Sequence, residues 1–168
     1  WKDLEDIRLV EVGFVSDERH PTEEMAYANV VREGKIIIQR REYSGESLGH
    51  LLDGRPHAGI VLRADAHAPW AACRVAVRAA RNRGRRVQVD YAPVPGLPHE
   101  QILDLPLPAV ETTIVDAEIA VAPDGSLRVV RPNPLEKGMA IRLHLPDDAT
   151  AGPVLRLAAE LRLAGVLV

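Results

Sequence analysis

A dense run of prolines divides this chain and constrains its fold more than any other feature of the sequence. The prolines of this run are Pro93, Pro95, Pro98, Pro106 and Pro108. Proline fixes φ and carries no backbone donor, so neither a helix nor a central strand can continue through such a run. We therefore predict an extended connector over residues 92–109, which joins a first unit at 1–91 to a second unit at 110–168.

The composition indicates that these units can bury a core. Of the 168 residues, 46% are apolar, which excludes disorder along the whole chain. No apolar run approaches the roughly 18 residues that a membrane-spanning helix needs. The net charge is −3, so the chain as a whole is not attracted to nucleic acid. The single cysteine, Cys73, has no partner for an internal disulfide.

The sequence begins at Trp1 rather than at a methionine, and we interpret this as the removal of an upstream segment. A signal peptide, a membrane anchor and an affinity tag all fit that interpretation.

The first unit is predicted to combine short strands with two helices. Gly34 lies in a polar turn between two β-branched runs, which is typical of a hairpin. Ser44 is a suitable N-cap for a short helix, and Pro69 fits the first turn of a longer one. The predicted elements are a strand at 10–15, a hairpin at 30–38, a helix at 44–52, a strand at 59–64, a helix at 69–84 and a strand at 87–89.

The second unit repeats much of this order. Its predicted elements are a hairpin at 117–130 with an Asp-Gly turn, a strand at 139–143, a helix at 150–165 and a strand from residue 166. Placing Gly84 on Gly165 aligns the apolar positions of strand, loop and helix without a gap. An internal duplication is the simplest cause. The copy is incomplete, because prolines at 132 and 134 stand where the first helix would be repeated.

Residues 30–91 resemble the periplasmic domain of the ExbD/TolR biopolymer-transport family. The resemblance rests on the strand at 34–38, on a leucine-bearing helix before an apolar strand, and on residues 61–70. In the last of these, a strand ends in an Ala-Asp pair and a Pro-aromatic step leads into a helix. Residues 117–168 look like a second, more divergent copy without that step.

The resemblance implies a role in the bacterial envelope. Members of the family carry an N-terminal membrane helix with an aspartate used in proton-driven coupling, and neither is present in this sequence. Their periplasmic domain dimerises and contacts an inner-membrane motor or transducer protein, or peptidoglycan. Two fused copies would replace the homodimer by a pseudo-dimer within one chain.

These observations predict an α+β protein made of two similar small units, each a mixed sheet with helices on one face. We expect a non-enzymatic module on the periplasmic side of the inner membrane, part of a system coupled to the proton-motive force. It would bind a protein partner or peptidoglycan, without a cofactor or metal, and not nucleic acid. A membrane would be reached only through a helix outside this sequence.

The strongest candidate for a binding surface is a row of arginines on the second predicted helix. Arg74, Arg78, Arg81 and Arg85 recur at helical spacing, so they share one face, and Trp70 begins the same helix. Guanidinium groups bind carboxylates and phosphates. A solvated face whose cations stabilise the end of the helix dipole is the structural alternative. The functional alternative is a cytosolic domain that binds an anionic ligand or RNA, although few aromatic side chains accompany the arginines.

Acidic and histidine side chains near the end of the apolar strand form a second candidate. Asp53, His57, Asp65 and His67 would hold a metal or move protons if the fold brought them together. Alternatively, Asp65 accepts backbone N–H groups at the start of the next helix. Cys73 falls on the apolar side of that helix and is predicted to be buried and inert.

Overall fold

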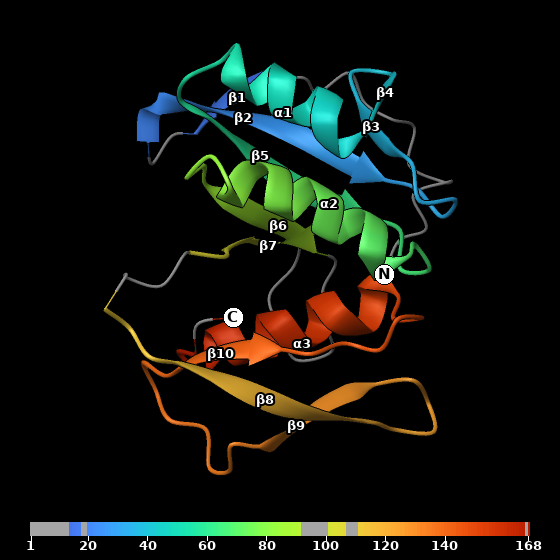
Figure 1. Cartoon of the computed structure of the whole chain (residues 1–168), viewed down its shortest axis with the longest axis vertical. Coiled ribbons are helices and arrows are strands. Elements are labelled where there is room, and N and C mark those ends of the chain that lie inside the picture. Colours follow the sequence, from blue (N-terminus) through green and yellow to red (C-terminus); the bar gives the residue numbers. More distant parts are fainter. Residues whose placement is uncertain (1–13, 18–19, 92–100, 107–110, 167) are drawn as a thin grey trace.

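A computed structural model describes residues 14–17, 20–91, 101–106, 111–166 and 168. Within these ranges the protein is α+β, with a seven-stranded mixed sheet, a three-stranded mixed sheet and three helices (Figure 1). The predicted fold class is confirmed at this level.

The larger sheet is built around three parallel strands. Its members are β1 (Phe14–Asp17), β2 (His20–Val30), β3 (Ile36–Ile38), β4 (Arg41–Tyr43), β5 (Ala58–Ala64), β6 (Val87–Tyr91) and β7 (Gln101–Asp104). Their order is β4-β3-β2-β5-β6-β7, with β1 paired to β2. Strands β2, β5 and β6 are parallel, and the other pairings are antiparallel. Every residue of β5 except Arg63 is buried, as expected of a strand covered on both faces.

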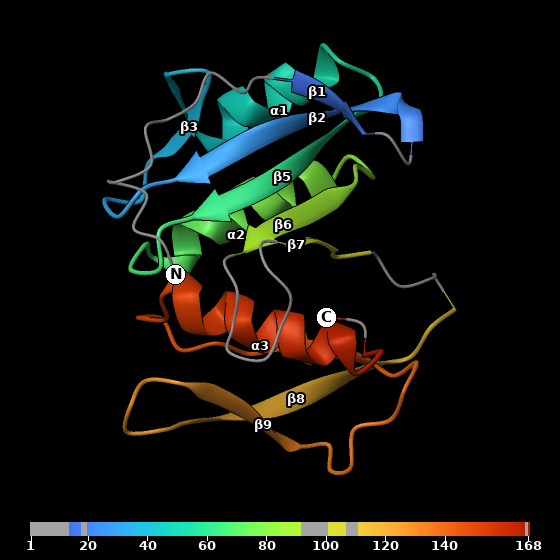
Figure 2. The ribbon, with the colours of Figure 1, turned by 180° about the vertical axis from the view of Figure 1, so that it is seen from behind.

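Two helices, α1 (Gly45–Asp53) and α2 (Trp70–Arg81), lie on one face of this sheet (Figure 2). The predicted cap of α1 is confirmed, because Ser44 and Ser47 each accept a hydrogen bond from the other's backbone N–H. The second helix is shorter than predicted. It is followed by a tight turn in which Gly84 adopts a φ of +63°, a conformation that favours glycine.

The second sheet contains β8 (Ile114–Val121), β9 (Leu127–Arg131) and β10 (Ala140–Leu143), and α3 (Ala151–Leu163) packs on it. Figure 1 shows α3 between the two sheets. One side of α3, with Leu155 and Ala159, belongs to the core of the larger sheet. Its other side, with Leu157 and Leu161, packs with residues of β8 and β10. The two sheets therefore share α3.

Three strands of the first unit and the three strands of the second have the same topology. In each, an antiparallel hairpin is joined by a parallel strand, giving the orders β5-β2-β3 and β10-β8-β9. A helix follows the parallel strand in both cases, α2 after β5 and α3 after β10. In the described residues of the second unit, no helix corresponds to α1. The strand predicted from residue 166 is also absent at Val166 and Val168.

The connector predicted over 92–109 was expected to be extended and to contain no helix or central strand, and its residues 101–104 form an edge strand that was not predicted. Strand β7 pairs antiparallel with β6, with Gln88 opposite Asp104, and so adds an edge strand to the larger sheet. An edge position tolerates neighbouring prolines because one side of the strand needs no donors. Residues 92–100 and 107–110 lie outside the described residues, as do 10–13 of the first predicted strand, whose residues 14 and 15 belong to β1.

Candidate functional site

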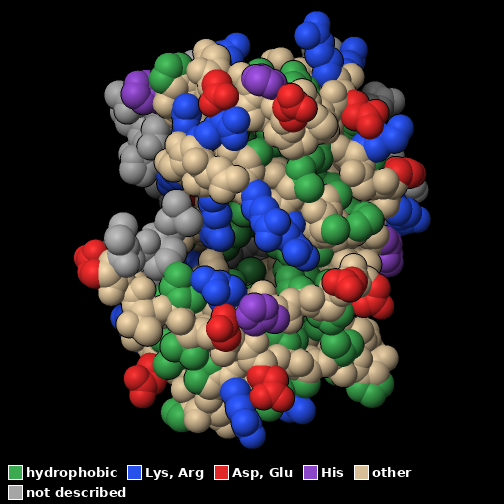
Figure 3. Space-filling model, viewed as in Figure 1, with side chains coloured by type: hydrophobic (Ala, Val, Ile, Leu, Met, Phe, Trp, Pro, Cys, Tyr) green, Lys and Arg blue, Asp and Glu red, His purple; other side chains and the backbone are tan. Residues whose placement is uncertain are grey.

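A groove runs between α2 of the first unit and β10 of the second, and we call it the α2–β10 groove. It has a volume of about 780 Å³, within the range of ligand-binding clefts. One side is formed by Trp70, Arg74, Val77, Arg78 and Arg81 of α2, and the other by residues 140–145. Side chains of α3 complete it, namely Val154, Leu155 and Ala158. Figure 3 shows a hollow at the centre of this face, with basic side chains along one margin and hydrophobic ones inside it.

Helix α2 brings three of the four predicted arginines to the groove. Its opposite side carries Cys73 and Ala76, which are fully buried in the core. Burial raises the pKa of the Cys73 thiol to about 12, so this side chain is not a nucleophile near neutral pH. The amphipathic pattern of α2 therefore points Arg74, Arg78 and Arg81 toward the second unit.

Arg85 has a different environment from the other three arginines. Its guanidinium donates hydrogen bonds to the carbonyl oxygens of Leu52, Arg55 and Ala58, at 3.2, 2.7 and 3.3 Å. These contacts hold the end of α1 to the turn after α2. Arg85 does not line the groove. The prediction included Arg85 in the row by helical spacing, but α2 ends at Arg81, so Arg85 does not share its face.

Two of the groove arginines are available to a ligand. Arg74 is half-buried and Arg78 is exposed. Within the part of the chain that the structure describes, neither has a hydrogen-bond or ion-pair partner. The donors of a guanidinium group match the geometry of carboxylates and phosphates, so these two side chains have the chemistry to bind an anion.

Arg81 lies deeper in the same groove. Its Nη2 atom donates to the carbonyl oxygens of Val168 and Leu105, at 3.2 and 3.5 Å. Its Nε atom is buried and has no hydrogen-bond partner among the described residues, and burial lowers the pKa of this guanidinium. Arg81 therefore adds positive charge at one end of the groove while binding two segments of backbone.

On the β10 side of the groove, positive charge is largely neutralised. Asp116 accepts a hydrogen bond from His144 at 2.9 Å and lies 3.6 Å from the guanidinium of Arg142. The hydrogen bond from His144 is the main cause that lowers the pKa of the Asp116 carboxyl. Asp147 adds a negative charge at the same side. The net positive potential of the groove therefore comes from α2.

The structure does not gather the predicted Asp and His residues into one site. Asp53 forms an ion pair with Arg83 at 2.7 Å, and this hydrogen bond lowers the pKa of Asp53. Asp65 is fully buried, and its Oδ1 accepts the backbone N–H of His67 at 2.8 Å. This bond stabilises the turn before α2, whereas the role expected for Asp65 was at the first residues of that helix. His57 and His67 are exposed. Across the described residues, no three His, Cys, Asp or Glu side chains come close enough to hold a metal ion.

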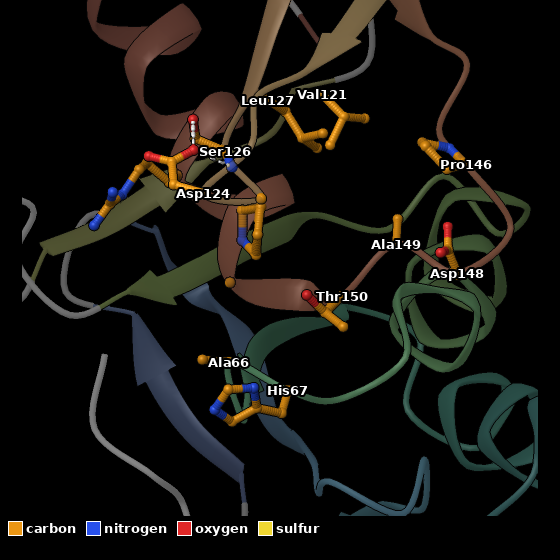
Figure 4. Close-up of a pocket in the computed structure, with 14 residues that line it drawn as sticks. Ala66, His67, Val121, Asp124, Ser126, Leu127, Pro146, Asp148, Ala149 and Thr150 are labelled. Atoms are coloured by element: carbon orange, nitrogen blue, oxygen red, sulfur yellow. Dashed lines mark hydrogen bonds between the residues drawn. The ribbon is translucent and has the colours of Figure 1, made fainter.

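A second cavity, of about 500 Å³, lies beside the start of α3 (Figure 4). Its polar residues include Asp124 and Ser126 of the β8–β9 turn, and His67 on the opposite side. The Ser126 hydroxyl donates to Asp124 at 2.7 Å, and this hydrogen bond is the main cause that lowers the pKa of Asp124. Both side chains thus stabilise the hairpin turn. In Figure 4, His67 lies on the opposite side of the cavity from Ser126.

Sequence reasoning identified the arginines but missed what faces them. One signal was present, because α3 carries buried apolar residues around most of its circumference, including Val154, Leu155, Leu157 and Leu161. A helix that is hydrophobic on all sides must be covered on all sides. The prediction placed a single apolar face on this helix, formed by residues 154, 157 and 161. That face explains the packing on the second sheet but does not explain why the side of α3 that carries Leu155 is also apolar.

No protein-family model, no curated protein and no solved structure matches this chain. Among the described helices, none combines the length and the apolar character needed to cross a membrane.

Proposed function

We propose that this chain is a non-enzymatic binding module of the ExbD/TolR type, composed of two fused copies of one unit. The copies form a pseudo-dimer that docks a protein partner or peptidoglycan on the periplasmic side of the inner membrane. The module serves an envelope transport or motor system driven by the proton-motive force. The order of hairpin, short helix, strand, longer helix and strand in the first unit supports this proposal, as does the shared topology of the second.

One reciprocal contact between the units carries the proposal. The Trp70 N–H donates to the carbonyl of Ala149, and the Ala151 N–H donates to the carbonyl of Ala68, both at 2.9 Å. The alignment that places Gly84 on Gly165 also places Ala68 on Ala149 and Trp70 on Ala151. Each copy thus offers the same two positions to the other.

Any antiparallel bridge exchanges two hydrogen bonds in this way. The support for two-fold symmetry comes from the residues that meet, because they are equivalent under the alignment. The same alignment pairs Pro69 with Thr150, and these two residues form an antiparallel bridge between the starts of α2 and α3. The sequence offset was set by placing Gly84 on Gly165 and was supported by the agreement of the apolar positions, so this contact is independent support for a duplication. A pseudo-dimer of this kind replaces the homodimer that the family resemblance implies.

The compartment provides the sharpest test of this function. A dual reporter, active as phosphatase only outside the cytoplasm and as β-galactosidase only inside it, is fused after Val168 in the natural gene. We expect phosphatase activity. A known cytoplasmic protein with the same fusion is the control, and β-galactosidase activity from the fusion at Val168 would overturn the proposed location.

A second candidate function is a cytosolic domain that binds an anionic ligand or RNA. The absence of described partners for Arg74 and Arg78 favours it. A gel-shift titration with single-stranded RNA over a range of salt concentrations separates the two functions. Tight binding lost steeply as salt rises would support this alternative, whereas the docking module is expected to give no complex.

A further inference from the structure

The cavity beside the start of α3 has a closed counterpart in the first unit. The turns of the β2–β3 and β8–β9 hairpins have the same form, because the N–H groups of Gly34 and Gly125 each donate to the carbonyl three residues earlier at 2.9 Å. A Cβ added at Gly34 would lie 3.6 Å from Pro69 and 3.7 Å from Ala72, at the start of α2. A Cβ added at Gly125 would meet no described atom within 4 Å. The same turn therefore packs on its helix in the first unit and stands clear of it in the second.

A longer hairpin in the second unit separates the turn from the helix. Leu62 of β5 is opposite Ala28, three residues before the β2–β3 turn begins. Its equivalent under the alignment, Leu143 of β10, is opposite Ala117, five residues before the β8–β9 turn begins. Two additional strand residues extend the hairpin by about 7 Å. The cavity is therefore a consequence of strand length in this unit.

Two side chains of opposite charge line the cavity and are available to a ligand. Asp148 precedes α3 and is exposed, and Arg156 lies in α3 and is half-buried. Within the part of the chain that the structure describes, neither makes a hydrogen bond or an ion pair shorter than 4 Å. The pKa of Asp124 is lowered mainly by the Ser126 hydroxyl and to a smaller extent by the charge of Arg156, so this guanidinium lies near the β8–β9 turn. Figure 4 shows Asp148 across the cavity from that turn.

The separation of these two charges indicates the length of a ligand. Arg156 lies about 9 Å along the axis of α3 from its N-cap, and Asp148 precedes that cap. The ammonium and carboxylate groups of a free amino acid are only about 3 Å apart, and each further extended residue adds about 3.5 Å. Two or three linked residues therefore match the separation. The volume of about 500 Å³ accepts such a ligand, and Val121, Leu127 and Pro153 offer apolar contacts.

We propose that this cavity binds a short peptide, of two or three residues, whose amino and carboxyl ends are both free. Its carboxylate pairs with Arg156, and its ammonium group pairs with Asp148. His67 of the first unit also lines the cavity, so the bound peptide contacts both units. The site is separate from the α2–β10 groove, and the inference goes beyond the proposed docking function without depending on it.

The first experiment titrates the chain of residues 1–168 with the tripeptide alanyl-valyl-alanine by isothermal titration calorimetry. Matched peptides carry an acetylated amino end, an amidated carboxyl end, or both. We expect the unmodified peptide to bind, each single modification to weaken binding about tenfold, and salt to weaken it as well. No binding of the unmodified peptide, or equal affinity for the unmodified and doubly modified peptides, would overturn the proposal.

Single variants assign each end of the peptide to its side chain. In Arg156→Gln, the unmodified and amidated peptides are expected to bind equally, whereas acetylation should still weaken binding. In Asp148→Asn, the reverse is expected. Each variant should bind the unmodified peptide about tenfold more weakly than the parent chain does, which corresponds to about 1.4 kcal/mol. If either variant retained the full effect of both modifications, the assigned pairs would be wrong.

Two controls separate this cavity from overall charge and from loss of the fold. Arg128→Gln removes a positive charge from an exposed position of β9 outside the cavity, and a change in affinity below about twofold is expected. Thermal unfolding followed by circular dichroism verifies that the variants fold, and the unmodified peptide should raise the melting temperature of the parent chain. An equal loss of affinity in Arg128→Gln and Arg156→Gln would show that binding reflects overall charge and not this cavity.

This test and the test of the proposed function have separate outcomes. Phosphatase activity of the reporter without peptide binding would contradict only the peptide site. Peptide binding with β-galactosidase activity would place a real peptide site in the cytoplasm and contradict only the proposed function.

Discussion

The parallel strands β5 and β10 hold equivalent places in the two units but have different surroundings. Strand β5 is covered by β6 on one edge and by β2 on the other, and nearly all of its side chains are buried. Strand β10 pairs only with β8 among the described residues, and its Arg142 is exposed. The same local pattern thus gives a core strand in one unit and a groove-lining strand in the other. What lies beside a strand, more than the strand itself, decides whether its side chains are buried.

The largest effect should come from α3, which serves both units. Leu155→Ala removes a side chain that is 1% exposed and contacts the core of the larger sheet, and we expect a loss of about 2–5 kcal/mol in the free energy of unfolding. Leu161→Ala, in the second core, is the matched substitution. Urea denaturation followed by circular dichroism and by tryptophan fluorescence measures both. Coincident shifts of the two signals are expected, whereas two separate transitions would show that the units do not depend on each other through α3.

A smaller effect is expected at the reciprocal contact between the units. A Cβ added at Gly152 would lie 3.1 Å from both the Cβ and the carbonyl oxygen of Ala66. Gly152→Ala should therefore push the segments at Ala66 and Gly152 apart and lower the free energy of unfolding by about 1–3 kcal/mol. Gly54→Ala is the control, because its added Cβ meets no atom closer than 3.6 Å. Thermal unfolding compares them, and equal melting temperatures would argue against a tight contact at this position.

Two arginines of the predicted row, Arg74 in α2 and Arg85 in the turn after it, should differ in their effect on the free energy of unfolding. Arg85→Ala removes hydrogen bonds to three carbonyl oxygens, and a loss of about 1–2 kcal/mol is expected. Arg74→Ala removes no described hydrogen bond and should leave the free energy of unfolding nearly unchanged. Chemical denaturation of the two single variants measures the free energy of unfolding of each and so tests this difference between Arg85 and Arg74. If Arg74→Ala proves the more destabilising, the separation into structural and available arginines is wrong.

The smallest effect concerns pH. The hydrogen bond from Arg83 lowers the pKa of Asp53 below its ordinary value of 3.8. A carboxyl with a lowered folded-state pKa stabilises the fold above its unfolded pKa, and this contribution disappears as pH falls through the folded pKa. Asp53→Asn should therefore reduce stability slightly at neutral pH and converge with the parent protein below pH 3.8. Melting temperatures measured from pH 2 to 7 check this, and parallel curves would contradict it.

Much of the local structure could be predicted because its causes are local. The cap at Ser44, the glycine turns at 34 and 125 and the apolar strand at 59–64 depend on neighbouring residues alone, and the structure confirms them. Strand β2 was not predicted in full. Its first residues, at 20–23, have no partner in β5, since the β2–β5 pairing begins at Glu24. A proline at 21 is tolerated at such an edge, and a polar stretch there does not exclude a strand.

The features that were missed depend on pairing between distant residues. Strand β7 exists because β6 offers an edge, and the prolines around it gave no sign of that partner. Helical spacing predicted the arginines of the candidate site. It did not predict that Arg85 would bond backbone carbonyl oxygens while the other three line the groove. This difference depends on where α1 ends, some thirty residues earlier in the chain. Local periodicity predicts which side chains share a face and not what that face will meet.

The sharing of α3 by two cores has a mechanical consequence. Closely packed interiors transmit displacement rather than absorbing it. A pulling force applied at the β10 edge would therefore be transmitted through α3 to the larger sheet, without a hinge at the place where the two sheets meet. The two sheets are therefore expected to move as a single body.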